Sequence, residues 1–283
     1  MNRRKPLKEL NLLDKFLFDE AMDDPENVKT MLDIILSQNT NLKHPPQTEK
    51  EQRTSTDNRQ IRLDVYAIDE DDVIYEVEAQ KENTHNLPKR SRLYQGIIDS
   101  KLLPPGVVDF NLLNEVLIVL IMPFDLFGYG LYRYTFHMRC EEVPELKLDD
   151  GATRIFLNTR GKHPELVSQE LIELLKYMER STDEVSGTCK SKRIQEMHRR
   201  ICQIKASEKT EVKYMQLWEE KILIKQEGIA EGIAEGIAEG ERIGLERINR
   251  LNQKLIEQGR FDDLTKAVSD SVYQKKLLKE FKI

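Results

Sequence analysis

Two short runs in which apolar and polar residues alternate constrain the fold of this chain more than any other feature. They span residues 61–68 and 73–80 and flank four consecutive acidic residues, Asp69 to Asp72. Side chains of a β-strand point alternately to the two faces of its sheet, so this pattern predicts two half-buried strands. A short polar connection between two such runs predicts a β-hairpin.

The register of this hairpin decides which polar side chains share a face. Pairing of Ile68 with Ile74 places Asp64 opposite Glu78, whereas a shift of one residue moves Asp64 to the other face. We expect the first register because it separates apolar from polar side chains. The expected apolar face contains Ile61, Leu63, Val65, Tyr75, Val77 and Ala79. The expected polar face contains Asp64, Glu76, Glu78 and Gln80.

Helical and strand-like segments follow one another along the rest of the chain. Asp24 before Pro25 predicts a helix start, with an aspartate cap and proline at the first helical position. The run 116–121 is apolar on both faces, which is typical of a central strand covered by helices. The other expectations are a surface loop over 37–60, a helix over 87–101, strands over 129–139 and 154–158, and helices from residue 164 onward. This order predicts an α/β fold with a helical C-terminal extension.

A four-residue repeat, Gly-Ile-Ala-Glu, occupies residues 228–239 and is followed by Gly240 and Gly244. Each glycine costs a helix about 0.5–1 kcal/mol relative to alanine, so a helix here needs a compensating gain. At a spacing of four, the glycines form one slowly drifting stripe that would let a second helix approach closely. The alternative is a solvated low-complexity linker.

Composition excludes several protein classes. The chain has 283 residues, of which 39% are hydrophobic, enough for a real core. Its longest apolar run, 116–124, has nine residues and contains a proline, far short of the roughly 20 that a membrane span needs. The basic N-terminus lacks the apolar stretch of a secretory signal. Three widely spaced cysteines are expected to be reduced thiols of a cytoplasmic protein.

The charge distribution allows a nucleic-acid partner only at a local surface, because the formal net charge is −6. Residues 81–101 hold five basic and two acidic side chains, and residues 190–209 hold seven and two. Either segment could supply such a surface.

The acidic face of the predicted hairpin is the main candidate for chemistry. Glu78 and Gln80 lie two residues apart on one strand, and the expected register adds Asp64. Clustered carboxylates repel one another unless a cation lies between them, and Mg²⁺ prefers carboxylate oxygens together with substrate phosphate. The alternative is a solvent-facing polar side of an antiparallel hairpin.

Other motifs fail. Gly128-x-Gly130 lacks the further residues of a dinucleotide site, and the phosphate-binding and serine-hydrolase motifs are missing from the sequence. The five histidines include no pair four residues apart, and we expect no metal-type partner near Cys189 or Cys202.

The order of Asp64, a hairpin turn and Glu78-Ala79-Gln80 resembles the D…(D/E)-x-K signature of the PD-(D/E)XK nuclease superfamily, in the variant that ends in glutamine. More narrowly, the chain resembles the Rpn (recombination-promoting nuclease) family, also described as PD-(D/E)XK nuclease family transposases. The resemblance covers most of residues 10–280. It also rests on Leu13-Asp14-Lys15-Phe16-x-Phe18, Arg62-Leu63-Asp64-Val65, Leu87-Pro88-Lys89-Arg90-Ser91-Arg92-Leu93-Tyr94, Pro123-Phe124-Asp125-Leu126-Phe127 and the glycine–glutamate repeat.

The resemblance implies a restriction-endonuclease-like mixed β-sheet flanked by helices, and a Mg²⁺-dependent DNA endonuclease, with Mn²⁺ as an alternative metal. Such an enzyme hydrolyses phosphodiesters with a metal-activated water and leaves 5′-phosphate and 3′-hydroxyl ends. The implied catalytic residues are Asp64, Glu78 and Gln80. The implied metal ligands are Asp64, Glu78 and Asp14. The implied contacts to the DNA backbone are Arg90, Arg92 and Tyr94.

Glutamine at position 80 lacks the positive charge of the usual lysine, although its amide can still hydrogen-bond water or a phosphate oxygen. Glutamine is usual at this position in the resembling family, so it does not argue against activity. The alternative function is a catalytically silent nuclease fold that binds DNA or oligomerises. We expect a nuclease-like core over 10–162, a helical region over 163–227, and the glycine-repeat helix with a helical tail over 228–283. We also expect a homodimer formed through the C-terminal helical region.

Overall fold

The protein is described by a computed structural model that covers residues 4–52 and 61–283. Its internal contacts divide the chain into two compact units, Met1–Tyr214 and Met215–Ile283. The sequence placed boundaries after residues 162 and 227. The helices that follow residue 162, as far as Ala206, pack with the helices and the sheet of the first unit.

The described residues of the first unit form a six-stranded mixed sheet with the strand order β1-β2-β3-β4-β6-β5. The strands are β1 (Gln47–Gln52), β2 (Ile61–Ile68), β3 (Ile74–Ala79), β4 (Val116–Met122), β5 (Arg133–Phe136) and β6 (Ala152–Asn158). Strand β4 pairs in parallel with both β3 and β6, and the outer pairs β1–β2, β2–β3 and β5–β6 are antiparallel. The predicted central position of the 116–121 segment is confirmed.

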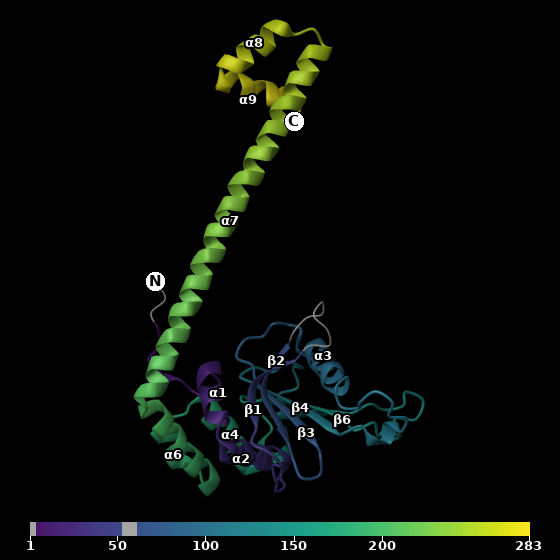
Figure 1. The fold of residues 1–283 in the computed structure, drawn as a ribbon, viewed down its shortest axis with the longest axis vertical. Coiled ribbons are helices and arrows are strands. Elements are labelled where there is room, and N and C mark those ends of the chain that lie inside the picture. Colours follow the sequence, from purple (N-terminus) through teal and green to yellow (C-terminus); the bar gives the residue numbers. More distant parts are fainter. Residues whose placement is uncertain (1–3, 53–60) are drawn as a thin grey trace. The chain divides into compact units, whose positions relative to one another are not determined.

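Helices cover both faces of this sheet (Figure 1). One face packs against α1 (Lys15–Met22), α2 (Pro25–Leu36) and α4 (Gln169–Glu179), and the other packs against α3 (Leu87–Asp99). Helix α6 (Lys192–Ala206) packs on α1, α2 and α4. The shorter elements are α5 (Asp183–Thr188) and the 3₁₀ turns η1 (Leu7–Glu9), η2 (Phe110–Leu112) and η3 (Pro164–Leu166). The α/β class and the flanked mixed sheet are therefore confirmed.

Helix α2 begins where the sequence predicted. The Asp24 side chain accepts a hydrogen bond from the Glu26 amide at 3.0 Å, and Pro25 occupies the first helical position. This cap satisfies one of the amide groups that a helix start leaves without an intrahelical partner.

The β2–β3 hairpin has the expected register, because Ile68 pairs with Ile74 and Val65 pairs with Val77. Asp64 and Glu78 are the next residues beyond the Val65–Val77 pair. The prediction that Ile61 and Leu63 share a face with Tyr75 is wrong, since both belong to the apolar cluster beneath α3.

The change of face has a local cause. The pairing of β2 with β3 runs from Val65 to Ile68, so the first half of β2 pairs with β1 only. On β1, Glu49 lies opposite Asp64 by register and has a left-handed backbone with φ of 49°. Such a residue breaks the regular alternation of a strand.

The expectation of a surface loop over residues 37–60 is wrong in part, because strand β1 lies within this range. The residues of β1, Gln-Thr-Glu-Lys-Glu-Gln, are all polar, so no alternation marked them as a strand. An edge strand with one neighbour needs little apolar surface, and charges on it discourage further pairing. Residues 53–60 of the expected loop lie outside the described part. The strand expected over 129–139 is shorter, since β5 contains four residues.

The second unit contains most of a long helix and two short ones. Helix α7 (Glu208–Glu257) begins in the first unit and includes the whole glycine repeat, and α8 (Phe261–Ser269) and α9 (Ser271–Glu280) follow it. Gly259, with φ of 68°, ends α7, because glycine adopts this left-handed conformation without strain. Leu251 and Leu255 of α7 pack against Ala267 and Leu277.

A Cβ atom added to any of the five glycines of α7 would have nothing within 4 Å, so the stripe is open in the structure. No helix among the described residues is both long and apolar enough to span a lipid bilayer.

Candidate active site

The candidate site lies where β2 and β3 carry their acidic side chains. Asp64 and Glu78 are each 7% exposed, and Glu76 is fully buried. Glu76 and Glu78 lie two residues apart on β3, which places them on one face of the sheet. The three carboxylates are close enough for their charges to affect one another.

Lys15, the first residue of α1, is the cation nearest to Asp64. Its Nζ lies 2.5 Å from Asp64 Oδ1 and 3.2 Å from Asp19 Oδ2. Lys15 and Asp19 are four residues apart on α1 and so face the same side of the helix. Burial raises the pKa of Asp19 to about 7, and the charges of Asp64 and Glu49 add to the effect while Lys15 opposes it.

Arg90 of α3 holds the other end of the cluster. Its Nη2 lies 2.5 Å from Glu78 Oε1 and 2.5 Å from Gln80 Oε1. Its guanidinium carbon is 5.9 Å from the centre of the Tyr94 ring, one helical turn further along α3. Arg90 and Tyr94 therefore lie on the same helix face, as residues four apart in a helix do.

The cluster contains carboxylate oxygens that lack hydrogen-bond donors. Within the described part of the chain, neither oxygen of Glu76 has a donor, and neither does Oε2 of Glu78. Burial, with the charges of Glu78 and Asp64, raises the pKa of Glu76 well above its usual value. Burial raises the pKa of Glu78 to about 7, with Arg90 opposing and Asp64 adding to the shift.

Buried carboxylates whose oxygens lack donors can be satisfied by a cation. Four acids (Asp19, Asp64, Glu76 and Glu78) face two bases (Lys15 and Arg90), so the group has an excess of two negative charges when fully ionised. Hard divalent cations bind such oxygen donors. The donor set therefore fits Mg²⁺ or Mn²⁺, with Lys15 and Arg90 as competing cations.

Asp14 and Arg92, which the family resemblance also implicated, are placed differently. The Asp14 carboxylate contacts Lys5 at 3.0 Å, Lys81 at 2.5 Å and the Asn11 amide at 2.9 Å. Although burial acts to raise it, these hydrogen bonds hold the pKa of Asp14 below its usual value. Lys81 directly follows Gln80, so Asp14 lies beside the end of β3. Arg92 is exposed and points away from Arg90, since two residues advance a helix by about 200°.

A groove of about 400 Å³ lies beside Arg90, between α3 and the start of β2. Three of its lining residues, Arg62, Lys89 and Arg90, are basic, and Leu93 and Tyr94 supply apolar surface. Burial, together with the negative charge of Glu78, raises the pKa of Tyr94, so its hydroxyl stays protonated at neutral pH.

Sequence reasoning missed two members of this cluster, Lys15 and Asp19, and placed Glu76 on the polar face without assigning it a role. Lys15 and Asp19 were recognisable only as a spacing of four on one helix, and nothing local indicated that α1 packs beside β2. Glu76 was regarded as a polar neighbour, and its complete burial depends on α3 covering that face.

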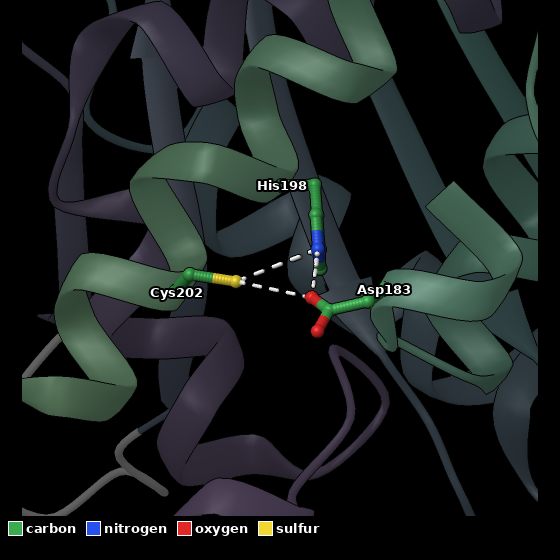
Figure 2. Close-up of side chains that lie close together, drawn as sticks. All are labelled: Asp183, His198 and Cys202. Carbon is green, nitrogen blue, oxygen red and sulfur yellow. Dashed lines mark hydrogen bonds and ion pairs between the residues drawn. The ribbon is translucent and has the colours of Figure 1, made fainter. Parts of the chain in front are cut away.

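The expectation that Cys202 has no metal-type partner is wrong. His198 lies four residues before it on α6, and Asp183 of α5 joins them, so that one donor atom from each residue lies within 4.8 Å of the others (Figure 2). The search of the sequence considered pairs of histidines and overlooked a histidine–cysteine pair. Cys140, Cys189 and Cys202 are all free thiols, as expected.

Comparison of the chain with protein-family models, curated proteins and solved structures finds no match. The site must therefore be interpreted from its own geometry and from the motifs in the sequence.

Proposed function

We propose that this protein is a Mg²⁺-dependent DNA endonuclease of restriction-endonuclease-like fold, related to the recombination-promoting nucleases and acting in the cytoplasm. The observation that supports this proposal best is the buried group of Asp64, Glu76 and Glu78, in which three oxygens lack a donor within the described residues. A solvent-facing hairpin side, the alternative weighed from the sequence, does not fit carboxylates that are at most 7% exposed.

Asp64 and Glu78 would hold the metal ion, with Glu76 behind them. Asp14 at the end of β3 remains a third candidate ligand. When bound, Mg²⁺ would polarise a phosphoryl oxygen and activate water for attack on phosphorus. The side chains present determine where that ion and the phosphate can lie.

Gln80 and Arg90 would act on the substrate. Arg90 is held by Glu78 and Gln80, and its planar guanidinium suits a phosphate group. The Gln80 amide donates to the Glu82 carbonyl at 2.5 Å and can exchange that partner for a phosphate or water oxygen. Without lysine at position 80, Arg90 beside Glu78 and Lys15 beside Asp64 are the positive charges that would stabilise the developing transition state.

The basic groove beside Arg90 would receive the DNA backbone. Lys89, Arg62 and Arg90 line this groove, and their positive charges would contact backbone phosphates. We propose that Tyr94, and Arg92 on the outer side of α3, add contacts to the same strand. This part of the proposal explains how a chain of net charge −6 binds DNA locally.

A second candidate function is a catalytically silent nuclease fold that binds DNA or oligomerises. The ion pairs of Lys15 with Asp64 and of Arg90 with Glu78, both at 2.5 Å, favour it because they occupy one oxygen of each intended ligand. A metal ion must compete with both bases.

Nicking of supercoiled plasmid by the full-length protein, with Mg²⁺, with Mn²⁺ and with EDTA, separates the two functions. We expect metal-dependent nicking that the substitution Asp64→Ala abolishes, because one of the two principal ligands is lost. The matched control is Asp71→Asn, an exposed acid in the turn of the same hairpin, which should leave nicking unchanged. Circular dichroism would verify that both variants fold.

DNA binding without nicking in any metal would support the silent module and refute the nuclease. Full nicking by a folded Asp64→Ala protein would refute the assignment of the site.

We further propose a homodimer formed through the C-terminal helical region, in which the glycine stripe of α7 receives a second helix. Cutting of both DNA strands by two sites would suit such an assembly. Light scattering of the full-length protein would measure its mass directly, and a monomer at micromolar concentration would contradict this part.

A further inference from the structure

A second group of potential metal ligands lies on the helical side of the first unit. His198 Nε2 is 2.8 Å from Asp183 Oδ1 and 3.4 Å from Cys202 Sγ, and Cys202 Sγ is 3.9 Å from Asp183 Oδ1. Figure 2 shows the three side chains converging, with the histidine and cysteine on α6 and the aspartate on α5. This group shares no residue with the carboxylate cluster of the hairpin.

Local structure keeps the three donors in place. His198 and Cys202 are four residues apart on α6 and therefore lie on one face, a turn apart. Asp183 is the first residue of α5, which begins with Thr182 as its cap. His198 is 9% exposed, and its Nδ1 lies 2.9 Å from the hydroxyl of the buried Tyr177 on α4.

The arrangement differs from that of a catalytic cysteine–histidine–aspartate relay. In a relay the acid binds one ring nitrogen and the thiol binds the other, so that the proton passes across the ring. Here Tyr177 occupies Nδ1, while Asp183 lies at Nε2 and Cys202 Sγ is closer to Nε2 (3.4 Å) than to Nδ1 (3.9 Å). The Cys202 sulfur, 3.4 Å from Nε2 and 3.9 Å from Nδ1, lies over the face of the ring, so a proton relay across the ring is not formed, and the three donor atoms lie within reach of a common metal ion.

The distances also fit a particular ion. Tetrahedral Zn²⁺ with ordinary bond lengths separates nitrogen from oxygen by about 3.3 Å, nitrogen from sulfur by about 3.6 Å, and oxygen from sulfur by about 3.6 Å. The observed separations of 2.8, 3.4 and 3.9 Å each lie within about 0.5 Å of these values. The separations therefore need only small changes, and a rotation of the Cys202 or His198 side chain would bring Sγ from the ring face toward the Nε2 lone pair.

We propose that Asp183, His198 and Cys202 form a Zn²⁺ site. Imidazole nitrogen and thiolate sulfur suit this borderline ion, whereas Mg²⁺ prefers oxygen alone. In the tautomer that carries its proton on Nδ1, His198 would donate a hydrogen bond to the Tyr177 hydroxyl oxygen and present Nε2 to the metal, as outer partners of histidine ligands commonly arrange. The Asp183 side chain is 95% exposed, so the fourth position is open to water.

The bound ion would fix α5 on α6. Helix α5 has six residues, too few to be stable alone, and Asp183 attaches its first turn to the longer helix. The Lys205 ammonium, which binds the Ser181 carbonyl at 2.8 Å, supplies a nearby positive charge that partly balances the thiolate and the carboxylate. Zinc would therefore order the segment between α4 and α6.

Cobalt substitution in the full-length protein tests the site directly. The reduced, metal-free protein is titrated with Co²⁺ in excess Mg²⁺, which fills oxygen-only sites. We expect a thiolate-to-cobalt charge-transfer band in the near ultraviolet and the visible bands of a tetrahedral centre. Zn²⁺ should displace the cobalt and abolish both signals.

Matched variants identify the ligands. Cys202→Ser should remove the charge-transfer band, and Cys140→Ser, a free thiol elsewhere in the same unit, should retain it. Asp183→Asn should weaken Zn²⁺ binding more than about tenfold, whereas the exposed neighbour Glu184→Gln should not change it. Asp183 is exposed, so its substitution carries little risk of misfolding.

Hydrogen exchange provides a second measurement. Zn²⁺ should protect the amides of α5 in the wild type and not in Asp183→Asn. Absence of the charge-transfer band in the wild type, or its persistence in Cys202→Ser, would overturn the proposal. Nuclease activity enters none of these measurements, so failure of the proposed function would not affect the result.

Discussion

Replacing either of two buried glutamates, Glu76 and Glu173, with methionine should change the stability of this protein in opposite directions. Glu76 is fully buried and neither of its oxygens has a donor within the described residues. Each unsatisfied buried acceptor costs about 1–3 kcal/mol. Methionine has a similar volume and no strongly polar atom, so Glu76→Met should stabilise the metal-free protein by about 1–3 kcal/mol. Loss of repulsion from Glu78 and Asp64 acts in the same direction.

Glu173 of α4 is the matched control. It is 7% exposed, and its Oε2 accepts hydrogen bonds from the amides of Lys190 at 2.9 Å and Ser191 at 3.1 Å. The substitution Glu173→Met leaves two amides without their acceptor. It should therefore destabilise the protein by about 1–3 kcal/mol, although the change in the side chain is the same.

Urea denaturation at pH 7 in EDTA measures both effects. The midpoint should rise for Glu76→Met and fall for Glu173→Met, with the slope unchanged if the unfolded state is unaffected. A destabilised Glu76→Met protein would refute the reasoning, because it would show that a water molecule or another polar partner already satisfies Glu76. Isosteric Glu76→Gln, which keeps the polar atoms, should lie between the wild type and Glu76→Met.

Two further predictions concern pH and the glycine stripe. The pKa values of Glu78 and Asp19 are raised to about 7. Their protonated forms therefore stabilise the folded state at low pH, and this stabilisation is lost as the pH rises through about 7. For Glu78 alone, the stabilisation that is lost is on the order of 3 kcal/mol. Denaturation in EDTA should therefore show lower stability at pH 8 than at pH 5, and Mg²⁺ should restore it at pH 8; higher stability at pH 8 without metal would contradict the assignment. In α7, Gly232→Ala with Gly236→Ala should stabilise the helix by about 0.5–1 kcal/mol each, because a Cβ there meets nothing within 4 Å. Circular dichroism measures that gain in the isolated helix. Light scattering should show a lower oligomer mass, because the added methyl groups would obstruct the second helix of the proposed homodimer, and an unchanged mass would contradict that packing.

The hairpin shows what local pattern determines. Its period-two alternation and acidic turn predicted β2, β3 and the Ile68–Ile74 pairing, because register is fixed when one face of a strand must be buried. The central strand and the Asp24 cap were likewise predicted from the sequence, since each depends on residues close together in the chain.

Strand β1 shows where that reasoning ends. Its six residues are all polar, and they form a strand only because β2 offers an unpaired edge. The same holds for Ile61 and Leu63, whose face is decided by the irregular pairing around Glu49. Backbone hydrogen bonds to a distant segment leave little trace in the side-chain pattern.

The candidate site divides in the same way. The sequence alone determined that Asp64, Glu78 and Gln80 share one hairpin and that Arg90 and Tyr94 share one helix face. Only the tertiary structure brought Lys15 to Asp64 and Arg90 to Glu78, buried Glu76, and set Asp183 beside His198 and Cys202. The physical reason is that periodicity encodes which side of an element is buried, whereas packing between elements decides which charges meet there.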